Sequence, residues 1–396
     1  MRLLRSRMQT SGLKREVGVF GAVLLGLGSI LGTGVFVVVG LGAGLAGWGV
    51  VPAIVLAGLL AVCNGLNSAQ LAAAHPVSGG TYEYGYRLLT PGLGFTAGWL
   101  FLLAKSASAA TAALAIGHYF FPRFEVIIAL LIIAGMTALV LNGVRRSNLL
   151  NAVIVGLTVL AIVIYSLFGL FGNSGTWDGG FSALGTLEAA ALLFVGYTGY
   201  GRIATMGEEI SNPRRNIPRA MFWTLGVSAL LYVGVGIASA RSVPTPIFWK
   251  VAGIVAMLGV LLNLILGLSR VLLAMGRRGD MPTLFAKVDA SDQPRAAVIG
   301  ITVIIVVLSL MGSIQLAWSF SAFTVLCYYA LTNLASLKLG SKQRLYPKWI
   351  AWCGLAGCLF LALWVPIPVM LSGLFLIFIG LVWQYFFKRI ATKSSF

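Results

Sequence analysis

The chain has 396 residues, of which 59% are hydrophobic and only 10% are charged. A water-soluble fold does not need this balance, so the composition excludes a soluble domain and predicts a polytopic membrane protein. The net charge of +18 would suggest nucleic-acid binding in a soluble protein. In a membrane protein it is typical of basic cytoplasmic loops, and we expect no nucleic-acid partner.

Twelve apolar stretches are long enough to cross a bilayer as helices, since one crossing takes about 20 apolar residues. They lie near residues 17–40, 46–74, 93–117, 125–143, 149–171, 184–206, 219–240, 249–275, 296–312, 316–337, 348–364 and 367–387. The connections are short, which predicts a single transmembrane domain over residues 1–396. The segment 75–94 is too polar to span, and we expect either an interfacial or re-entrant segment or an ordinary amphipathic loop helix.

The distribution of basic residues predicts the orientation of the chain. With the N-terminus inside and alternating spans, most lysines and arginines fall on inner segments, while the outer segments hold only Arg123, Arg241 and Lys250. Because basic residues collect on the cytoplasmic side of membranes, both termini are expected in the cytoplasm.

The first span contains the uncharged run GLGSILGTGVFVVVG at residues 26–40, in which Gly26, Gly28, Gly32 and Gly34 lie close together. Each glycine costs a helix interior about 1 kcal/mol relative to alanine. The sixth span carries Gly196, Gly199 and Gly201 at a similar depth. These two spans open successive blocks of five, and because five is odd the blocks have opposite orientations. Paired interruptions of this kind indicate an inverted-repeat transporter.

An unwound stretch within a membrane helix leaves backbone groups that must line a protein cavity. There a half-helix N-terminus suits a carboxylate and free carbonyls suit an ammonium group or a cation, so a zwitterionic amino acid fits both. The alternative is close helix packing, because Gly28 and Gly32 also form a small-xxx-small pattern.

Four motifs resemble signatures of amino-acid permeases of the amino acid–polyamine–organocation (APC) superfamily. They are GSILGTGVF at 28–36, HPVSGGTYEYGYR at 75–87, GYGRIATMGEEISNPRRNIPRA at 199–220 and SRVLLAMGRRGDMP at 269–282. The chain is most similar to the bacterial permeases that resemble cationic amino acid transporters, which implies the inner membrane of a bacterium.

The resemblance implies an all-α fold of twelve transmembrane helices of the leucine-transporter type. Its first five-helix repeat would occupy residues 17–171, its inverted second repeat 184–337, and its two additional C-terminal helices 348–387.

The resemblance also implies the substrate site at the middles of spans 1 and 6. The expected substrate-binding residues are Gly28, Ser29, Ile30, Gly32, Thr33 and Gly34 in the first span and Phe194, Val195, Gly196, Tyr197 and Thr198 in the sixth. One of the aromatic residues Phe194, Tyr197 and Tyr200 would gate it.

Two departures from the family pattern bear on substrate and coupling. Thr158 occupies the position of a span 5 lysine that is often present in this group, and Gly201 and Arg202 stand where an acidic residue is expected. The missing acidic residue favours neutral amino acids as substrates. The missing lysine leaves open whether the coupling ion is a proton or sodium. Ser269 and Thr33 are candidates for a cation site.

Isolated charges within spans are costly and are functional candidates by default. Lys105 lies in span 3, where it either replaces the missing lysine and carries a proton or pairs structurally. The remaining gating candidates, which form either an inner gate or a static set of ion pairs, are Arg202, Glu208, Glu209 and Arg270.

The best-supported hypothesis is a secondary amino-acid transporter that works by alternating access, with the amino acid and the lipid bilayer as its partners. A non-transporting amino-acid receptor and a membrane enzyme are the alternatives, and an enzyme is disfavoured because His75 and His118 are distant and buried acids are few. No metal or other cofactor is expected. The four cysteines lie in apolar runs, and the loop YFFPRFE carries none, so no disulfide-linked ancillary subunit is expected.

Overall fold

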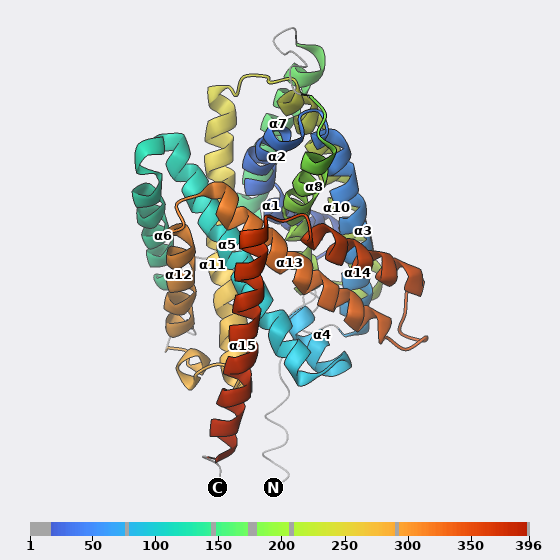
Figure 1. Ribbon diagram of the computed structural model, residues 1–396, viewed down its shortest axis with the longest axis vertical. Coiled ribbons are helices and arrows are strands. Elements are labelled where there is room, and N and C mark those ends of the chain that lie inside the picture. Colours follow the sequence, from blue (N-terminus) through green and yellow to red (C-terminus); the bar gives the residue numbers. More distant parts are fainter. Residues whose placement is uncertain are drawn as a thin grey trace.

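Apolar helices form the whole architecture of the computed structural model, which describes residues 17–75, 79–143, 148–172, 180–205, 210–289 and 293–393. In these ranges the only β contacts are isolated bridges, Val17 with Ile210 and Gly47 with Phe181. Most long helices run along the long axis of the molecule, while α5 and α13 cross it at an angle (Figure 1).

The first half of the chain contains α1 (Val19–Ile30), a π-helical turn (Gly34–Val38), α2 (Val39–Ala46), α3 (Val50–Ala74), α4 (Thr81–Leu88), α5 (Pro91–Phe120), α6 (Glu125–Leu141) and α7 (Asn148–Phe171). The second half contains α8 (Ala183–Tyr197), a 3-10 turn (Thr198–Tyr200), α9 (Gly201–Thr205), α10 (Pro213–Ala240), α11 (Ile247–Arg278), α12 (Arg295–Ser309), α13 (Ile314–Leu337), α14 (Lys348–Ala362) and α15 (Ile367–Lys393).

Eight of the described helices are long and apolar enough to cross a membrane. A ninth span results if α1 and the helical stretch Gly34–Ala46, which are bent by 43° at their junction, are counted together. The helices α12 and α14 are apolar but shorter, and the sixth predicted span is divided among α8, the 3-10 turn and α9. Each predicted range therefore contains helix, while the total of twelve crossings stays a prediction.

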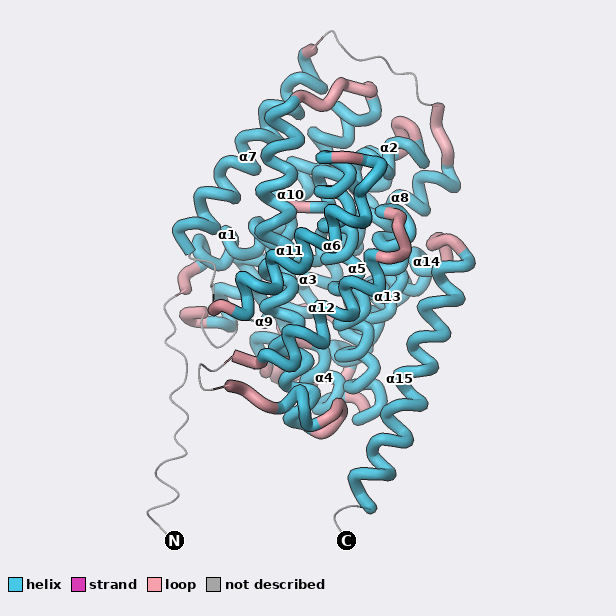
Figure 2. The backbone as a smooth tube through the Cα atoms, turned by 90° about the vertical axis from the view of Figure 1, so that its left-hand side faces the viewer, coloured by secondary structure: helices cyan, strands magenta, loops and turns pink. Residues whose placement is uncertain are grey.

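Burial separates a central helix from the lipid-facing ones. The apolar part of α5 is almost wholly buried, whereas α6 and α15 expose most of theirs, including Leu131, Phe375 and Phe378. The centre of α5 reads SASAATAALA, and these small side chains let α11 and α13 pack closely against it. α5 lies inside the bundle (Figure 2), in contact with α4, α6, α11, α12, α13 and α15.

The segment after α3 forms the eight-residue helix α4, which contacts α5 and α13. Tyr82 and Tyr84 on this helix are buried. α4 lies at the same end of the molecule as the C-terminal part of α15 (Figure 1), and we call this end the α4 side.

Buried amides join α3 to α13. The Asn67 amide donates to Asn333 Oδ1 at 2.8 Å, and the Asn333 amide donates to Asn64 Oδ1 at 2.6 Å. Gln70 donates to Ser336 Oγ at 2.6 Å. Polar side chains buried among apolar helices are stable when bonded to one another in this way, so α3 and α13 are held in one register.

Candidate functional site

The first helix interruption lies between α1 and the π-helical turn. The Leu31 N–H still donates to Leu27 O at 2.8 Å, but the Gly32 N–H turns back to Ile30 O at 2.9 Å, which ends the α-helical pattern. The chain resumes as a π-helix at Gly34, a form that often marks functional sites. The interruption predicted from the glycines is therefore present at residues 31–33.

The second interruption is milder than a fully unwound stretch. α8 ends at Tyr197 and continues directly into the 3-10 turn Thr198–Tyr200 and then α9. The Thr198 hydroxyl donates to Val195 O at 2.7 Å, which bonds a backbone carbonyl at the end of α8. The expected interruption is thus a tightened turn.

The two interruptions are in backbone contact with each other. A Cβ atom added to Gly34 would lie 2.8 Å from the Gly196 Cα, and one added to Gly199 would lie 2.5 Å from the carbonyl carbon and oxygen of Ser29. These close approaches require glycine, because the opposing atoms belong to the backbone and cannot move aside by rotation of a side chain.

Two other glycines of the first span instead pack against side chains of neighbouring helices. A Cβ at Gly28 would lie 2.7 Å from Asn151 Oδ1 on α7, and a Cβ at Gly32 would lie 2.6 Å from Val260 Cγ2 on α11. The packing interpretation of the sequence pattern therefore describes these two positions.

Tyr232 on α10 bridges the interruptions. Its buried hydroxyl lies 3.1 Å from Ile30 O and 3.3 Å from Gly196 O, so one donor serves a carbonyl from each broken helix. Sequence reasoning missed this residue, because nothing in a single sequence links Tyr232 to positions 30 and 196.

We expect Tyr232→Phe to lower the free energy of unfolding by roughly 1 kcal/mol, the usual net contribution of one hydrogen bond, and to reduce uptake severalfold. Tyr165→Phe is the matched control, because the buried Tyr165 hydroxyl donates to Val243 O at 3.0 Å in another part of the bundle. Thermal unfolding in detergent should give similar losses for both variants, while vesicle uptake should fall only for Tyr232→Phe. Equal effects on uptake would contradict a role in joining the interruptions.

A cavity of about 320 Å³ begins at the interruptions and extends toward the α4 side. This volume falls within the range of small-molecule sites, roughly 300–1,000 Å³. Five of the predicted site and coupling residues line it: Ser29, Thr198, Lys105, Arg202 and Arg270. The other described ones lie outside its lining: Gly28, Ile30, Gly32, Thr33, Gly34, Phe194, Val195, Gly196, Tyr197, Thr158, Tyr200 and Ser269.

Lys105 reaches the second interruption from α5. Its Nζ donates a hydrogen bond to Thr198 Oγ1 at 2.7 Å, and the Thr198 hydroxyl in turn donates a hydrogen bond to Val195 O. The side chain is partly buried and also lines the cavity. The structure therefore places an ammonium group directly beside the candidate substrate site.

Several lining residues were not predicted: Phe101 on α5, Asn263 on α11, and Tyr328 and Tyr329 on α13. Phe101 lies one helical turn before Lys105, and Asn263 is an isolated polar residue in an apolar helix, so both carried a weak sequence signal. The Tyr329 ring packs edge-on against Phe194 at 5.7 Å. Phe194 thus supports the cavity wall from behind.

The remaining coupling candidates lie in differing surroundings. Thr158 is buried in α7, and Ser269 Oγ donates to Leu266 O at 3.0 Å within α11. The Thr33 hydroxyl is buried and has no hydrogen-bond partner among the residues that the structure describes. Glu208 and Glu209 lie outside the described residues, so the predicted inner gate is not placed.

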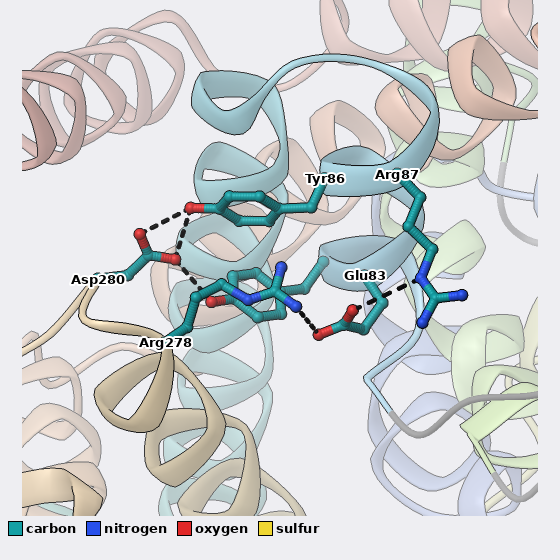
Figure 3. A network of polar contacts seen from close by, with 6 residues as sticks. Glu83, Tyr86, Arg87, Arg278 and Asp280 are labelled. Carbon is teal, nitrogen blue, oxygen red and sulfur yellow. Dashed lines mark hydrogen bonds and ion pairs between the residues drawn. The ribbon is translucent and has the colours of Figure 1, made fainter.

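On the α4 side, tyrosines of α4 are bound to the loop that follows α11 (Figure 3). The buried Asp280 carboxylate accepts hydrogen bonds from the Tyr82 and Tyr86 hydroxyls, each at 2.6 Å. Burial, together with the Asp280 charge, raises the pKa of both tyrosines, so they stay protonated as donors.

The same face of α4 carries an ion pair. Arg278 Nη2 lies 2.6 Å from Glu83 Oε1, and the Arg278 guanidinium lies 4.3 Å from the centre of the Tyr86 ring. We call this set (Tyr82, Glu83, Tyr86, Arg278 and Asp280) the α4–α11 clasp. Because Tyr82 also lines the cavity, the clasp fixes the cavity wall on this side.

An apolar helical bundle with two interrupted helices in contact at a central cavity defines a membrane transporter. The chain belongs to the amino acid permease family: one amino acid permease model matches residues 21–248 and a second matches residues 246–396. The protein is therefore an integral membrane protein of the APC superfamily.

Two bacterial relatives match almost end to end. An uncharacterized transporter of Mycobacterium tuberculosis is 36% identical, over 97% of this chain and 93% of the relative. The branched-chain amino acid permease BcaP of Bacillus subtilis is 28% identical, over 98% of this chain and 96% of the relative. A cationic amino acid transporter of Arabidopsis thaliana, named chloroplastic, is 29% identical over 70% of this chain and 58% of the relative.

Among solved structures, a manganese transporter from Eremococcus coleocola matches with a TM-score of 0.58 and 13% identity, covering 96% of this chain and 99% of that chain. At this identity the likeness shows the fold alone, which is of the leucine-transporter type. The all-α fold of the leucine-transporter type expected from the sequence is thus confirmed, while the count of twelve transmembrane helices stays a prediction.

Proposed function

We propose that this transporter is a secondary active permease that moves an amino acid across the bacterial inner membrane by alternating access, with no chemical step. The observation that carries the proposal is the backbone contact between the two interruptions at the end of a cavity lined by Ser29 and Thr198. Backbone groups released there suit the carboxylate and ammonium of an amino acid. The two inverted repeats, 17–171 and 184–337, would rock around this point, with residues 348–387 outside them.

The charge of the cavity argues against a cationic substrate. Lys105, Arg202 and Arg270 line it, and no carboxylate does so among the described residues. A cationic amino acid would meet like charges along its path, whereas a neutral substrate, as the sequence favours, would not. We therefore propose an amino acid without net positive charge.

We further propose that the described conformation faces the cytoplasm. The cavity extends to the α4 side, and the basic residues of the sequence favour the cytoplasm for that side and both termini. Across the opposite end, Tyr119 donates to Phe36 O at 2.9 Å and Trp318 donates to Leu192 O at 2.8 Å. These bonds tie α5 and α13 to the broken helices, which supports a closed outer end.

Proton coupling through Lys105 is the mechanism we propose, with sodium as the alternative ion and Thr33 and Ser269 as its candidate ligands. Purified protein in vesicles should accumulate amino acid under an inward proton gradient, and Lys105→Ala should abolish this accumulation while exchange against preloaded amino acid continues. Lys250→Ala is the control, since Lys250 is exposed at the start of α11.

Other outcomes decide among the alternatives. Sodium-driven uptake that is equal in the wild-type protein and in Lys105→Ala would contradict proton coupling through this lysine. Binding of amino acids without any turnover would favour the receptor hypothesis instead of transport.

A further inference from the structure

The positive charges of the cavity are arranged along its length. Lys105 lies at the interruptions, while Arg202 on α9 and Arg270 near the C-terminal end of α11 line the part toward the α4 side. Two acids of the described residues at this end are engaged elsewhere, since Asp280 accepts from two tyrosines and Glu83 pairs with Arg278. Glu208 and Glu209, which follow Arg202 in the sequence, lie outside the described residues. Among the described residues, the charged side chains that line the cavity are therefore all cationic.

Lys105 itself has neutral partners. Its ammonium donates to a threonine hydroxyl, and in the described ranges no carboxylate lies within ion-pair distance of it. An ammonium carries three donors, so two remain for a group in the cavity. A partly buried charge is stable in a protein when an opposite charge or several hydrogen bonds compensate its lost hydration.

We propose that the substrate supplies this opposite charge, and that it is an amino acid with an acidic side chain, of the glutamate or aspartate type. The inference rests on the proposed function and narrows its substrate class. The α-carboxylate and α-ammonium groups bind backbone at the interruptions, and the side-chain carboxylate binds Lys105 Nζ. A neutral amino acid leaves Lys105 uncompensated, whereas an acidic one brings the sum of their charges to zero.

The position of Lys105 makes this arrangement sterically direct. Its Nζ is 2.7 Å from Thr198 Oγ1, and Thr198 is the first residue of the 3-10 turn at the second interruption. A carboxylate two or three bonds beyond the Cα of a substrate bound there reaches the ammonium without leaving the cavity. Attraction between the two also couples transport to protonation, because an anion binds the ammonium form of Lys105 best.

The deciding experiment compares substrates that differ by charge and hardly in shape. Purified wild-type protein in vesicles is given radiolabelled glutamate or glutamine, and aspartate or asparagine, under an inward proton gradient. We expect each acid to be taken up with a kcat/KM roughly tenfold or more above that of its amide, the usual contribution of a charge-assisted hydrogen bond. This comparison needs no variant and so does not depend on the folding of one.

Variants then assign the preference to Lys105. Lys105→Met keeps most of the length of the side chain and removes the charge. In exchange against preloaded amino acid, which does not require proton coupling, its acid-to-amide ratio should fall to about one, while Lys105→Arg should retain a ratio above one. Lys250→Met should leave the ratio unchanged.

Equal or faster uptake of the amides by wild type, or an unchanged ratio in a folded Lys105→Met, would overturn the inference. Uptake of other neutral amino acids without the acids would overturn it too and leave the proposed function standing. If none of the twenty amino acids is transported, the proposed function fails as well.

Discussion

Replacing Gly199 by alanine should reduce uptake roughly 100-fold, because the new methyl group would lie 2.5 Å from the carbonyl carbon and oxygen of Ser29. Overpacking of this kind costs about 1–3 kcal/mol or more, and about 3 kcal/mol of lost transition-state stabilisation corresponds to a hundredfold rate. Gly34→Ala should act similarly, since its methyl group would lie 2.8 Å from the Gly196 Cα. Both changes push apart the two interruptions that are proposed to hold the substrate.

The matched controls are Gly40→Ala on α2 and Gly226→Ala on α10, where an added Cβ meets nothing within 4 Å. In a helix interior this exchange adds stability of roughly 0.5–1 kcal/mol, so both controls should transport normally. Vesicle uptake is measured together with thermal unfolding and size-exclusion profile. A folded Gly199→Ala protein that transports like wild type would refute the close-contact argument.

The fold was largely predictable from the sequence because a bilayer imposes a simple rule. Backbone groups in hydrocarbon must bond within their own segment, so long apolar runs form helices whatever their neighbours are. Every expected range contains helix, and the interruption at residues 31–33 lies among the glycines that predicted it. The second interruption is a 3-10 turn, since helix resumes directly at Gly201.

The candidate site was predictable only in part. The family resemblance implies Ser29 and Thr198, and its charge within a span singles out Lys105; all three line the cavity. Neither signal says which face of a helix points inward, and the structure places Gly28 and Gly32, also implied by the resemblance, against Asn151 and Val260.

Contacts between distant segments were not predictable. Tyr232 bonds to Ile30 across 202 positions, and Tyr82 bonds to Asp280 across 198. A single sequence gives the order of such residues but not their pairing. The α4–α11 clasp is therefore visible only in the structure, although its residues belong to two motifs that the sequence shows, HPVSGGTYEYGYR and SRVLLAMGRRGDMP.

Asp280→Ala should cause the largest loss of stability, about 3 kcal/mol or more in the free energy of unfolding. The carboxylate is 2% exposed and accepts from two phenols, and each hydrogen bond to a charged group contributes about 1.5–3 kcal/mol. The alanine variant also leaves the hydroxyls of Tyr82 and Tyr86 without this acceptor. The measurement is thermal or denaturant unfolding in detergent.

Asp289→Ala is the control, because Asp289 is partly exposed, accepts from the Gln293 N–H at 2.8 Å and pairs with Arg295, whose side chain is 62% exposed. Since surface ion pairs contribute only about 0–1 kcal/mol, its loss should be smaller than that of Asp280→Ala. Tyr82→Phe and Tyr86→Phe should each lower the free energy of unfolding by part of the loss expected for Asp280→Ala. Combining either change with Asp280→Ala should lower it little further, since the partners share one interaction. Equal losses for Asp280→Ala and Asp289→Ala would contradict the clasp. If the clasp fixes the α4 side of the cavity, the folded Tyr82→Phe variant should also have an altered uptake rate, because Tyr82 is both a donor to Asp280 and part of the cavity wall.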